Sequence, residues 1–260
     1  MSQRTFEYKE ADGIATVTLN RPQRRNALTP GDYEGLRDVA AQLRYREEIR
    51  VLVIRGAGGA FCAGGDLDET AAKVLKKGAR ANFEFMRVPA ELVRNLREMP
   101  QPVIAAVDGI AAGAGAALAL AADLRIFTSR ATLDFVFTKI GLSGGDMGAA
   151  WFLQRLIGLS AATELLMLGS ALDSARAHAL GLAHCVVEPE DIDSATNEMV
   201  ASLLQRPGWG LSATKQVLNR ATSIDYSTAL DLETWSQAML MTAPDFSEFA
   251  ERWTQRKRKE

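Results

Sequence analysis

Short apolar runs separated by stretches with helical spacing constrain the fold of this chain more than any other feature. They occupy residues 51–54, 103–107 and 124–127, and the first two are wholly apolar. Strands of this kind are typical of a parallel sheet that is covered on both faces. A further strand is expected at residues 14–19, where the pattern alternates, and residues 33–43 have helical spacing. The pattern in the first half of the chain therefore predicts an α/β core built from βαβ units.

The second half of the chain is mainly helical in pattern, and only residues 184–187 resemble a strand there. We therefore expect an α/β core over residues 1–195 and a C-terminal helical region over residues 196–260. Late helices without a sheet of their own often form an assembly surface, which is a hypothesis at this point. The helical patterns cover residues 147–156, 161–168, 174–180, 192–204, 212–221, 227–241 and 246–255.

The charge balance and the two cysteines exclude several classes of function. The 260 residues carry 30 basic and 32 acidic side chains, a formal net charge of −2, so no overall field favours nucleic acid or an anionic membrane. Residues 103–122 are mostly apolar, but Asp108 and three glycines favour a buried strand, turn and helix over a membrane span. Cys62 and Cys185 lie far apart and the first residues lack a signal peptide, so a cytoplasmic location is expected.

Two glycine-rich turns follow predicted strands, at residues 56–66 and 109–115. A dinucleotide fingerprint needs a third glycine where this chain has Phe61 and Leu118, and the Gly-Lys-Ser/Thr of a P-loop is absent. Glycine lets a ligand approach backbone N–H groups closely, so two such turns can direct two donors at one carbonyl oxygen. The alternative is that these glycines only make tight turns.

A third segment, residues 141–151, places Asp146 just before an apolar helical run. An aspartate there either caps the helix or acts as an acid or base in a glycine-walled cleft, and the two roles can coexist. No metal site is expected, because patterns such as HExxH are absent and packing or surface roles suit His178 and His184. A serine triad lacks its GxSxG turn.

These segments together resemble the crotonase superfamily, the enoyl-CoA hydratase/isomerase family. Each motif is weak alone, but the ordered set is specific and runs over nearly the whole chain. The resemblance implies a crotonase-like spiral of ββα turns, with a trailing helical region that drives trimers, often paired as hexamers. The landmarks are LNRP at residues 19–22, NAL at 26–28, AFCAGGDL at 60–67, PVIAAVDG at 102–109, ADLR at 122–125 and ALGL at 179–182.

The resemblance also implies a coenzyme A thioester as substrate, with no separate cofactor. The N–H groups of Gly65 and Ala114 would hold the thioester oxygen, and the Ala63 carbonyl would meet the adenine. Three basic residues would meet the CoA phosphates, the last from a neighbouring subunit: Arg24, Arg25 and Lys257. The other implied substrate-binding residues are Asp66, Leu67, Phe137 and Trp151.

One departure from the family limits the chemistry. Its hydratases carry two catalytic glutamates, and the corresponding positions here are Ala117 and Phe137, neither of which transfers a proton. Asp146 falls where isomerase-like and dehalogenase-like members carry a catalytic aspartate, but the dehalogenase histidine has no counterpart before His178. The sequence therefore predicts an acyl-CoA enzyme of hydratase/isomerase type with Asp146 as acid or base. Two alternatives stay open. One is acyl-CoA hydrolysis, including carbon–carbon cleavage of a cyclic β-keto thioester; the other is CoA-ester binding without catalysis.

Overall fold

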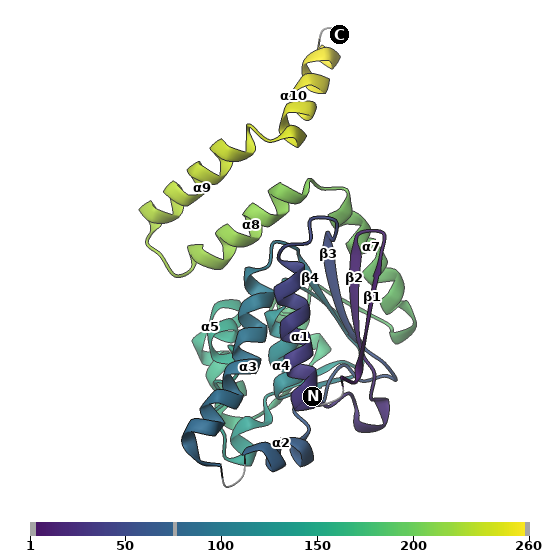
Figure 1. Ribbon diagram of the computed structural model, residues 1–260, viewed down its shortest axis with the longest axis vertical. Helices are drawn as coiled ribbons and strands as arrows, with labels where there is room; N and C mark the ends of the chain where they lie inside the picture. Colours follow the sequence, from purple (N-terminus) through teal and green to yellow (C-terminus); the bar gives the residue numbers. More distant parts are fainter. Residues whose placement is uncertain (1–3, 75–76, 258–260) are drawn as a thin grey trace.

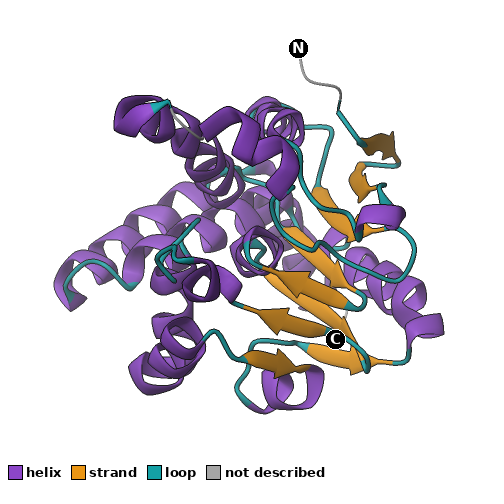
Figure 2. Ribbon diagram, turned by 90° about the horizontal axis from the view of Figure 1, so that it is seen from below, coloured by secondary structure: helices purple, strands orange, loops and turns teal. Residues whose placement is uncertain are grey.

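A six-stranded sheet lies at the centre of the computed structural model, which describes residues 4–74 and 77–257 (Figure 2). Its strands, in the order in which they pair, are β1 (Phe6–Ala11), β2 (Ile14–Leu19), β3 (Val51–Gly56), β4 (Val103–Val107), β6 (Leu124–Thr128) and β9 (Cys185–Val187). β1 is antiparallel to β2, and every later pair in the sheet is parallel. The predicted strands are thus present, and β1 is an additional edge strand.

A second sheet of three short strands lies beside the first. It consists of β5 (Ile110–Ala112), β7 (Thr132–Asp134) and β8 (Ala171–Asp173), with β7 in the middle. The expectation that residues 184–187 hold the only strand of the second half is therefore wrong. Three residues are too few to show a period of two, so pairing with distant neighbours, and not the local pattern, makes these strands.

Helices cover the two faces of the large sheet separately, which explains why β3 and β4 are so apolar. In β3, Leu52 and Ile54 belong to one core cluster and Val51 and Val53 to another, on the opposite face. Burying each such side chain contributes about 1.5–3 kcal/mol. The first face is covered by α1 (Pro30–Leu43), α3 (Gly78–Glu98) and α4 (Ala114–Ala121), and the other by α7 (Ile192–Leu204) (Figure 1).

The apolar stretch 103–122 forms β4, β5 and α4, one ββα turn of the spiral. α4 contains only alanine, leucine and glycine, and all of its residues are buried. Small side chains let a helix lie this deep between other layers. Within the described residues, no helix is long and apolar enough to cross a membrane.

The predicted helices at 147–156 and 161–168 join into one element that is interrupted at Gly158, whose φ of 80° and ψ of 162° are not helical. The remaining helices otherwise follow the predicted ones to within a few residues, and α2 is additional. They are α2 (Leu67–Val74), α5 (Ala149–Leu168), α6 (Ser174–Ala179), α8 (Gly208–Ala221), α9 (Tyr226–Leu240) and α10 (Pro244–Lys257). Short 3-10 turns occupy Pro22–Arg24, Val136–Ile140 and Pro189–Asp191.

The C-terminal helices differ in how they attach to the body. α8 is anchored by the buried Lys215, whose Nζ donates to the carbonyls of Leu96 and Gln101 at 2.8 Å and pairs with Asp123 at 2.8 Å. α9 and α10 extend away from the body (Figure 1). The expected division after residue 195 falls inside α7, which packs on the sheet. That division stays a prediction about folding units.

Candidate active site

The two glycine-rich turns lie against each other at the carboxyl ends of β3 and β4. The N–H groups of Phe61 and Cys62 both donate to the Ile110 carbonyl at 3.0 Å, and the Ala112 N–H donates to the Cys62 carbonyl at 2.8 Å. Ligand sites of parallel sheets form at this edge, where successive turns converge. The apposition predicted for the two turns is therefore present.

Glycine is required where these turns touch. A Cβ on Gly115 would lie 2.1 Å from the Cys62 carbonyl oxygen, which no side chain tolerates. Gly64 has a φ of +100°, and its Cβ would lie 2.9 Å from the Ala112 oxygen and 3.6 Å from the Ala114 nitrogen. The first turn therefore lies directly against the first residue of α4.

Two backbone N–H groups at this junction have no acceptor among the described residues. Ala114 opens α4, where the first N–H groups of a helix have no partner inside the helix. On the other turn, the Leu28 N–H donates to the Gly64 carbonyl at 2.7 Å and the Asp66 N–H donates to the Leu28 carbonyl at 2.8 Å. These bonds hold both sides of Gly65 and leave its own N–H available. Two donors on adjacent turns are the arrangement that an oxyanion site needs.

Asp146 is presented by a strained turn. Met147, which is buried, has a φ of 46°, and Gly148 has a φ of 82°. Non-glycine residues rarely adopt this left-handed conformation, and such strain is concentrated at functional sites. α5 begins at Ala149 with Gly148 as its N-cap and no side-chain cap, so Asp146 does not cap the helix.

The Asp146 carboxylate is partly withdrawn from water. Burial raises its pKa, and the hydrogen bond that it accepts from the Met147 N–H at 2.9 Å only partly opposes that rise. No ion pair with Asp146 occurs in the part of the chain that the structure describes. A carboxylate of raised pKa without a cationic partner is suited to proton transfer.

Tyr33 lies beside the first glycine turn, and the sequence did not single it out. Its side chain is 6% exposed, and burial, the Cys62 thiol and the Asp146 carboxylate together raise the pKa of its hydroxyl well above the ordinary value. Its Oη lies 3.1 Å from the point where a Cβ on Gly65 would be. The hydroxyl is therefore beside Gly65 and within electrostatic reach of Asp146.

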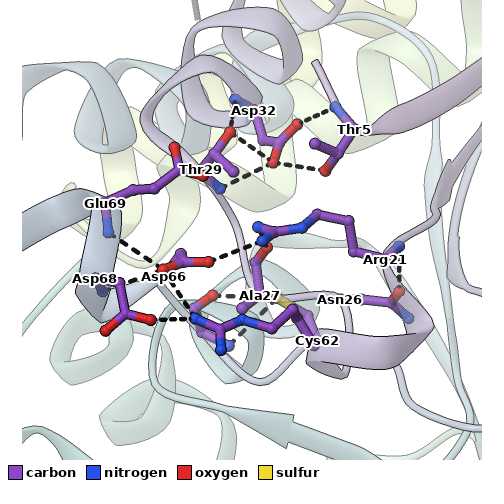
Figure 3. Close-up of polar contacts among 12 residues, drawn as sticks. Thr5, Arg21, Asn26, Ala27, Thr29, Asp32, Cys62, Asp66, Asp68 and Glu69 are labelled. Atoms are coloured by element: carbon purple, nitrogen blue, oxygen red, sulfur yellow. Dashed lines mark hydrogen bonds and ion pairs between the residues drawn. The ribbon is translucent and has the colours of Figure 1, made fainter. Parts of the chain in front are cut away.

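The start of α1 holds Tyr33 in place. The Asp32 N–H donates to Thr29 Oγ1 at 3.1 Å and the Thr29 N–H donates to Asp32 Oδ2 at 2.8 Å, which is a capping box (Figure 3). The Thr5 N–H adds a bond to Asp32 Oδ1 at 2.6 Å. Tyr33 follows directly in the chain, so its backbone belongs to the best-anchored turn of the helix.

Ala117 and Phe137, where the resemblance places the two glutamates of the hydratases, are both buried apolar residues. Ala117 is fully buried inside α4. Phe137 is 5% exposed, and its ring lies 3.8 Å from the point where a Cβ on Gly113 would be. Phe137 therefore forms an apolar wall beside the second glycine turn, next to Ala114.

Asp66 organises the basic end of the site (Figure 3). Its carboxylate, 1% exposed, pairs with Arg21 at 3.0 Å and Arg24 at 3.6 Å, and accepts the N–H groups of Asp68 and Glu69 at the start of α2. Burial would raise the pKa of Asp66, but the Glu69 N–H and the Arg21 guanidinium outweigh it and lower that pKa. These groups engage the carboxylate, which holds Arg21 and Arg24 in place, and a contact of Asp66 with the substrate stays a prediction. Arg21 was missed because it stands far from Asp66 in the sequence.

The residues implied for CoA binding lie on neighbouring loops. The Ala63 N–H donates to the carbonyl of Arg25 at 2.9 Å, and Arg25 is exposed. Arg24 also pairs with Asp68, and Leu67, the first residue of α2, is 63% exposed. An arginine-bearing loop thus lies beside the first glycine turn, with an exposed apolar side chain at its end.

Two further predicted binding residues, Trp151 and Lys257, lie on α5 and α10, and their contact with substrate stays a prediction. Trp151 is 38% exposed on α5, with the Arg155 guanidinium 3.9 Å above its ring and the Phe152 ring at its edge. These contacts connect Trp151 to its own helix. Lys257 is the last residue of α10, and its side chain lies outside the described part of the chain.

Other features of the described residues do not compete for this role. They contain no group of three or more His, Cys, Asp or Glu side chains that could hold a metal ion. A cavity of about 400 Å³ is lined by Ile49, Gln101 and Trp209 among others. It lies at the amino ends of β3 and β4, the edge opposite the glycine turns.

Comparison with known proteins agrees with this geometry. Residues 9–258 match a family model described as enoyl-CoA hydratase/isomerase. The chain is 36% identical to the 1,2-epoxyphenylacetyl-CoA isomerase of Escherichia coli, over 91% of this chain and 90% of that one. It is 35% identical to a probable enoyl-CoA hydratase of Rhodobacter capsulatus, over 95% and 94%. The crystal structure of a putative enoyl-CoA hydratase from Streptomyces coelicolor superposes with a TM-score of 0.94 at 42% identity, covering 97% and 92% of the two chains.

Proposed function

This chain belongs to the enoyl-CoA hydratase/isomerase family of acyl-CoA-processing enzymes, and from that premise we propose that it isomerises an acyl-CoA through an enolate. The N–H groups of Gly65 and Ala114 hold the thioester oxygen, and Asp146 moves the proton. The observation that carries the proposal is the contact between the two glycine turns, where both of these N–H groups have no acceptor among the described residues.

The two donors supply the electrostatic part of the chemistry. Hydrogen bonds to the thioester oxygen stabilise the negative charge that develops when a proton leaves the α-carbon. The positive end of α4, which begins at Ala114, adds to that stabilisation. Loss of one such donor typically lowers the rate by roughly 10²–10³-fold.

A single carboxylate favours isomerisation over the two-glutamate hydration mechanism. Asp146 takes a proton from one carbon as a base and returns it to another as an acid, so one group completes the cycle. Addition of water by the standard route needs a second acid, and Ala117 and Phe137 supply none. The isomerase name of the Escherichia coli relative is in keeping with this choice.

The CoA moiety binds along the loop that carries Arg24 and Arg25. Their guanidinium groups bind the phosphates, and the Ala63 carbonyl accepts a hydrogen bond from the adenine. Leu67 contacts the apolar part of the CoA moiety. Asp66 keeps the loop in place through Arg21 and Arg24. Phe137 borders the acyl group, and Trp151 stays a proposed second contact.

Assembly into trimers, singly or paired as hexamers, completes the proposal. α9 and α10 carry exposed apolar side chains, such as Trp235 at 72% and Met239 at 73% exposure. Patches of this kind mark subunit interfaces in soluble proteins. Assembly would bring Lys257 of one subunit toward the CoA of another. We propose that the protein is cytoplasmic. We propose no further cofactor, no nucleic-acid partner and no membrane contact.

The test is turnover of a panel of acyl-CoA esters, including 3-enoyl, cyclic and arylacetyl esters, by the full-length protein and by Asp146→Asn. Mass spectrometry and chromatography follow the products, and a thiol reagent follows free CoA. A product of unchanged mass and shifted structure, absent with the variant, is the expected result.

Other products favour the alternatives. Free CoA would identify a thioesterase, and a gain of one water with ring opening would identify carbon–carbon hydrolysis. Binding of CoA esters without any turnover would identify a binding protein. Unchanged turnover by Asp146→Asn would remove Asp146 from the chemistry.

A further inference from the structure

Two hydroxyl groups point at the same small space beside Gly65. The point where a Cβ on Gly65 would lie is 3.1 Å from Tyr33 Oη and 3.8 Å from Thr70 Oγ1. Tyr33 comes from α1 and Thr70 from α2, so two helices converge on the glycine that donates to the thioester oxygen. Alanine at this position would crowd the tyrosine hydroxyl, and glycine keeps the space open.

Both hydroxyls lack a protein partner. Thr70 Oγ1 is buried and makes no hydrogen bond to the described residues. The Tyr33 side chain is 6% exposed, and its hydroxyl makes no hydrogen bond within residues 4–74 and 77–257, but the hydroxyl oxygen itself is not fully buried. A buried polar atom without a partner is unfavourable, so Thr70 Oγ1 needs a ligand or water to complete it, and the unbonded Tyr33 hydroxyl lies close enough to bond the same group.

We propose that the Tyr33 and Thr70 hydroxyls form a subsite that recognises an uncharged oxygen on the acyl group. This oxygen is carried by carbon 2 or carbon 3 of the acyl chain, counting the thioester carbonyl as carbon 1. The inference rests on the proposed function, because it takes the thioester oxygen to lie at the Gly65 N–H. The subsite directs the enzyme toward oxygen-bearing acyl-CoA esters and against plain hydrocarbon ones.

The surrounding charges select a neutral acceptor. The buried Tyr33 keeps its proton and donates, while Thr70 donates or accepts. Asp146 and Asp32 are the negative groups that act on Tyr33, so an anionic substituent would be repelled. The nearby arginines, Arg21 and Arg24, are already paired with Asp66. A hydroxyl, oxo or epoxide oxygen fits these conditions.

The test is equilibrium binding, measured by calorimetry in the Asp146→Asn background so that turnover does not interfere. The probes are butyryl-CoA and 3-hydroxybutyryl-CoA, which differ by one oxygen. We expect the hydroxy ester to bind at least about tenfold more tightly, since a site built to bond an oxygen rejects the analogue without it. Adding Tyr33→Phe or Thr70→Val should reduce that ratio to about threefold or less.

A matched control separates this role from a structural one. Tyr45→Phe removes a hydroxyl from a tyrosine that is 81% exposed, and should leave the binding ratio unchanged. Because the Tyr33 hydroxyl bonds no described protein group, Tyr33→Phe should keep or raise the thermal unfolding midpoint. A lower midpoint together with an unchanged ratio would show that the hydroxyl only supports the fold, and would overturn the subsite.

Two further outcomes distinguish the inference from its premise. Equal binding of both esters by the Asp146→Asn protein would overturn the subsite and leave the acyl-CoA site intact. A loss of affinity for both esters in equal measure on Tyr33→Phe would make Tyr33 a donor to the thioester oxygen and also overturn the subsite. If neither ester bound, the acyl-CoA site itself would fail, and the subsite with it.

Discussion

At the scale of single residues, Asp146 combines a structural cost with a chemical use. Its half-buried carboxylate has a raised pKa, because burial disfavours the charge and the Met147 N–H compensates only in part. Its turn places Met147 in a left-handed conformation that costs of order 1–3 kcal/mol. Positions that are unfavourable for the fold and suited to proton transfer are the ones where function rather than stability selects the residue.

Asp146→Asn should therefore lose activity without losing stability. We expect kcat to fall by about 10²–10⁴-fold, the range for a removed general base. Since the folded-state pKa is raised, this carboxyl favours folding below its unfolded pKa, and that contribution is lost as pH rises through the folded pKa. At neutral pH the variant should unfold at the same temperature as the wild type or higher, as measured by calorimetry. A clear drop in the unfolding temperature would mean that the charged carboxylate supports the fold.

Asp146 should also set how kcat/KM falls at acidic pH. As a base Asp146 must be ionised, so kcat/KM should fall with decreasing pH through a pKa above the ordinary range of aspartate. The measurement is a pH–rate profile with a turned-over ester, alongside circular dichroism to show that the protein stays folded. A limb at the ordinary aspartate value would argue against a desolvated base.

Ala114→Pro tests the backbone donor directly. Proline lacks the N–H but is well tolerated at the first position of a helix, which is where Ala114 stands in α4. We expect kcat/KM to fall by about 10²–10³-fold while the far-ultraviolet circular dichroism spectrum is retained. Activity within a few-fold of the wild type would show that the Ala114 N–H holds no developing charge.

At the scale of elements, the start of α2 is joined to the loop before α1 by Asp66. Asp66→Asn keeps an oxygen for the helix N–H groups but removes the charge that pairs with Arg21 and Arg24. We expect a loss of about 1–3 kcal/mol in the free energy of unfolding. A rise in KM for CoA esters should accompany it, as Arg24 loses a partner.

The stability that Asp66→Asn loses should depend on pH. The folded-state pKa of Asp66 is lowered, so its stabilisation is present above the unfolded pKa and disappears as pH falls through the folded pKa. Urea unfolding at a series of pH values should show the wild type and Asp66→Asn converging in acid. A difference that stays constant from neutral to acidic pH would contradict the ion-pair account.

The elements differ in how well the sequence alone predicts them. β4 and the first four residues of β3 were predictable because both faces are buried and every position there is apolar. β8 was not, because three residues show no period and its pairing depends on β7. The glycine turns were predictable as close approaches. The place of Tyr33 in the site was not, since it depends on how α1 lies over the first turn.

At the scale of the whole molecule, α9 and α10 extend from the body with large apolar side chains exposed (Figure 1). Exposed surface of this kind is unfavourable in an isolated chain, by roughly 25 cal/mol for each Å² of apolar area left in water. Coverage by copies of the same chain removes that penalty, in keeping with the proposed trimer.

Replacement of Trp235 and Met239 by glutamate should dissociate the assembly, because two desolvated charges would face the interface. Light scattering coupled to size-exclusion chromatography should show trimer or hexamer for the wild type and monomer for the double variant. Tyr45→Glu, on an exposed side chain of the body, is the control and should assemble normally. A monomeric wild type would remove the proposed assembly and the role of Lys257 in it.

In the proposed reaction, Asp146 moves a proton at an acyl carbon while two N–H groups hold the thioester oxygen. The most direct measurement is deuterium exchange: an arylacetyl-CoA or 3-enoyl-CoA ester is incubated in deuterated water, and incorporation next to the carbonyl is followed by mass spectrometry and NMR. We expect rapid exchange with the wild type and a loss of about 10²-fold or more with Asp146→Asn and with Ala114→Pro. Exchange that is undiminished in Asp146→Asn would contradict the proposed reaction.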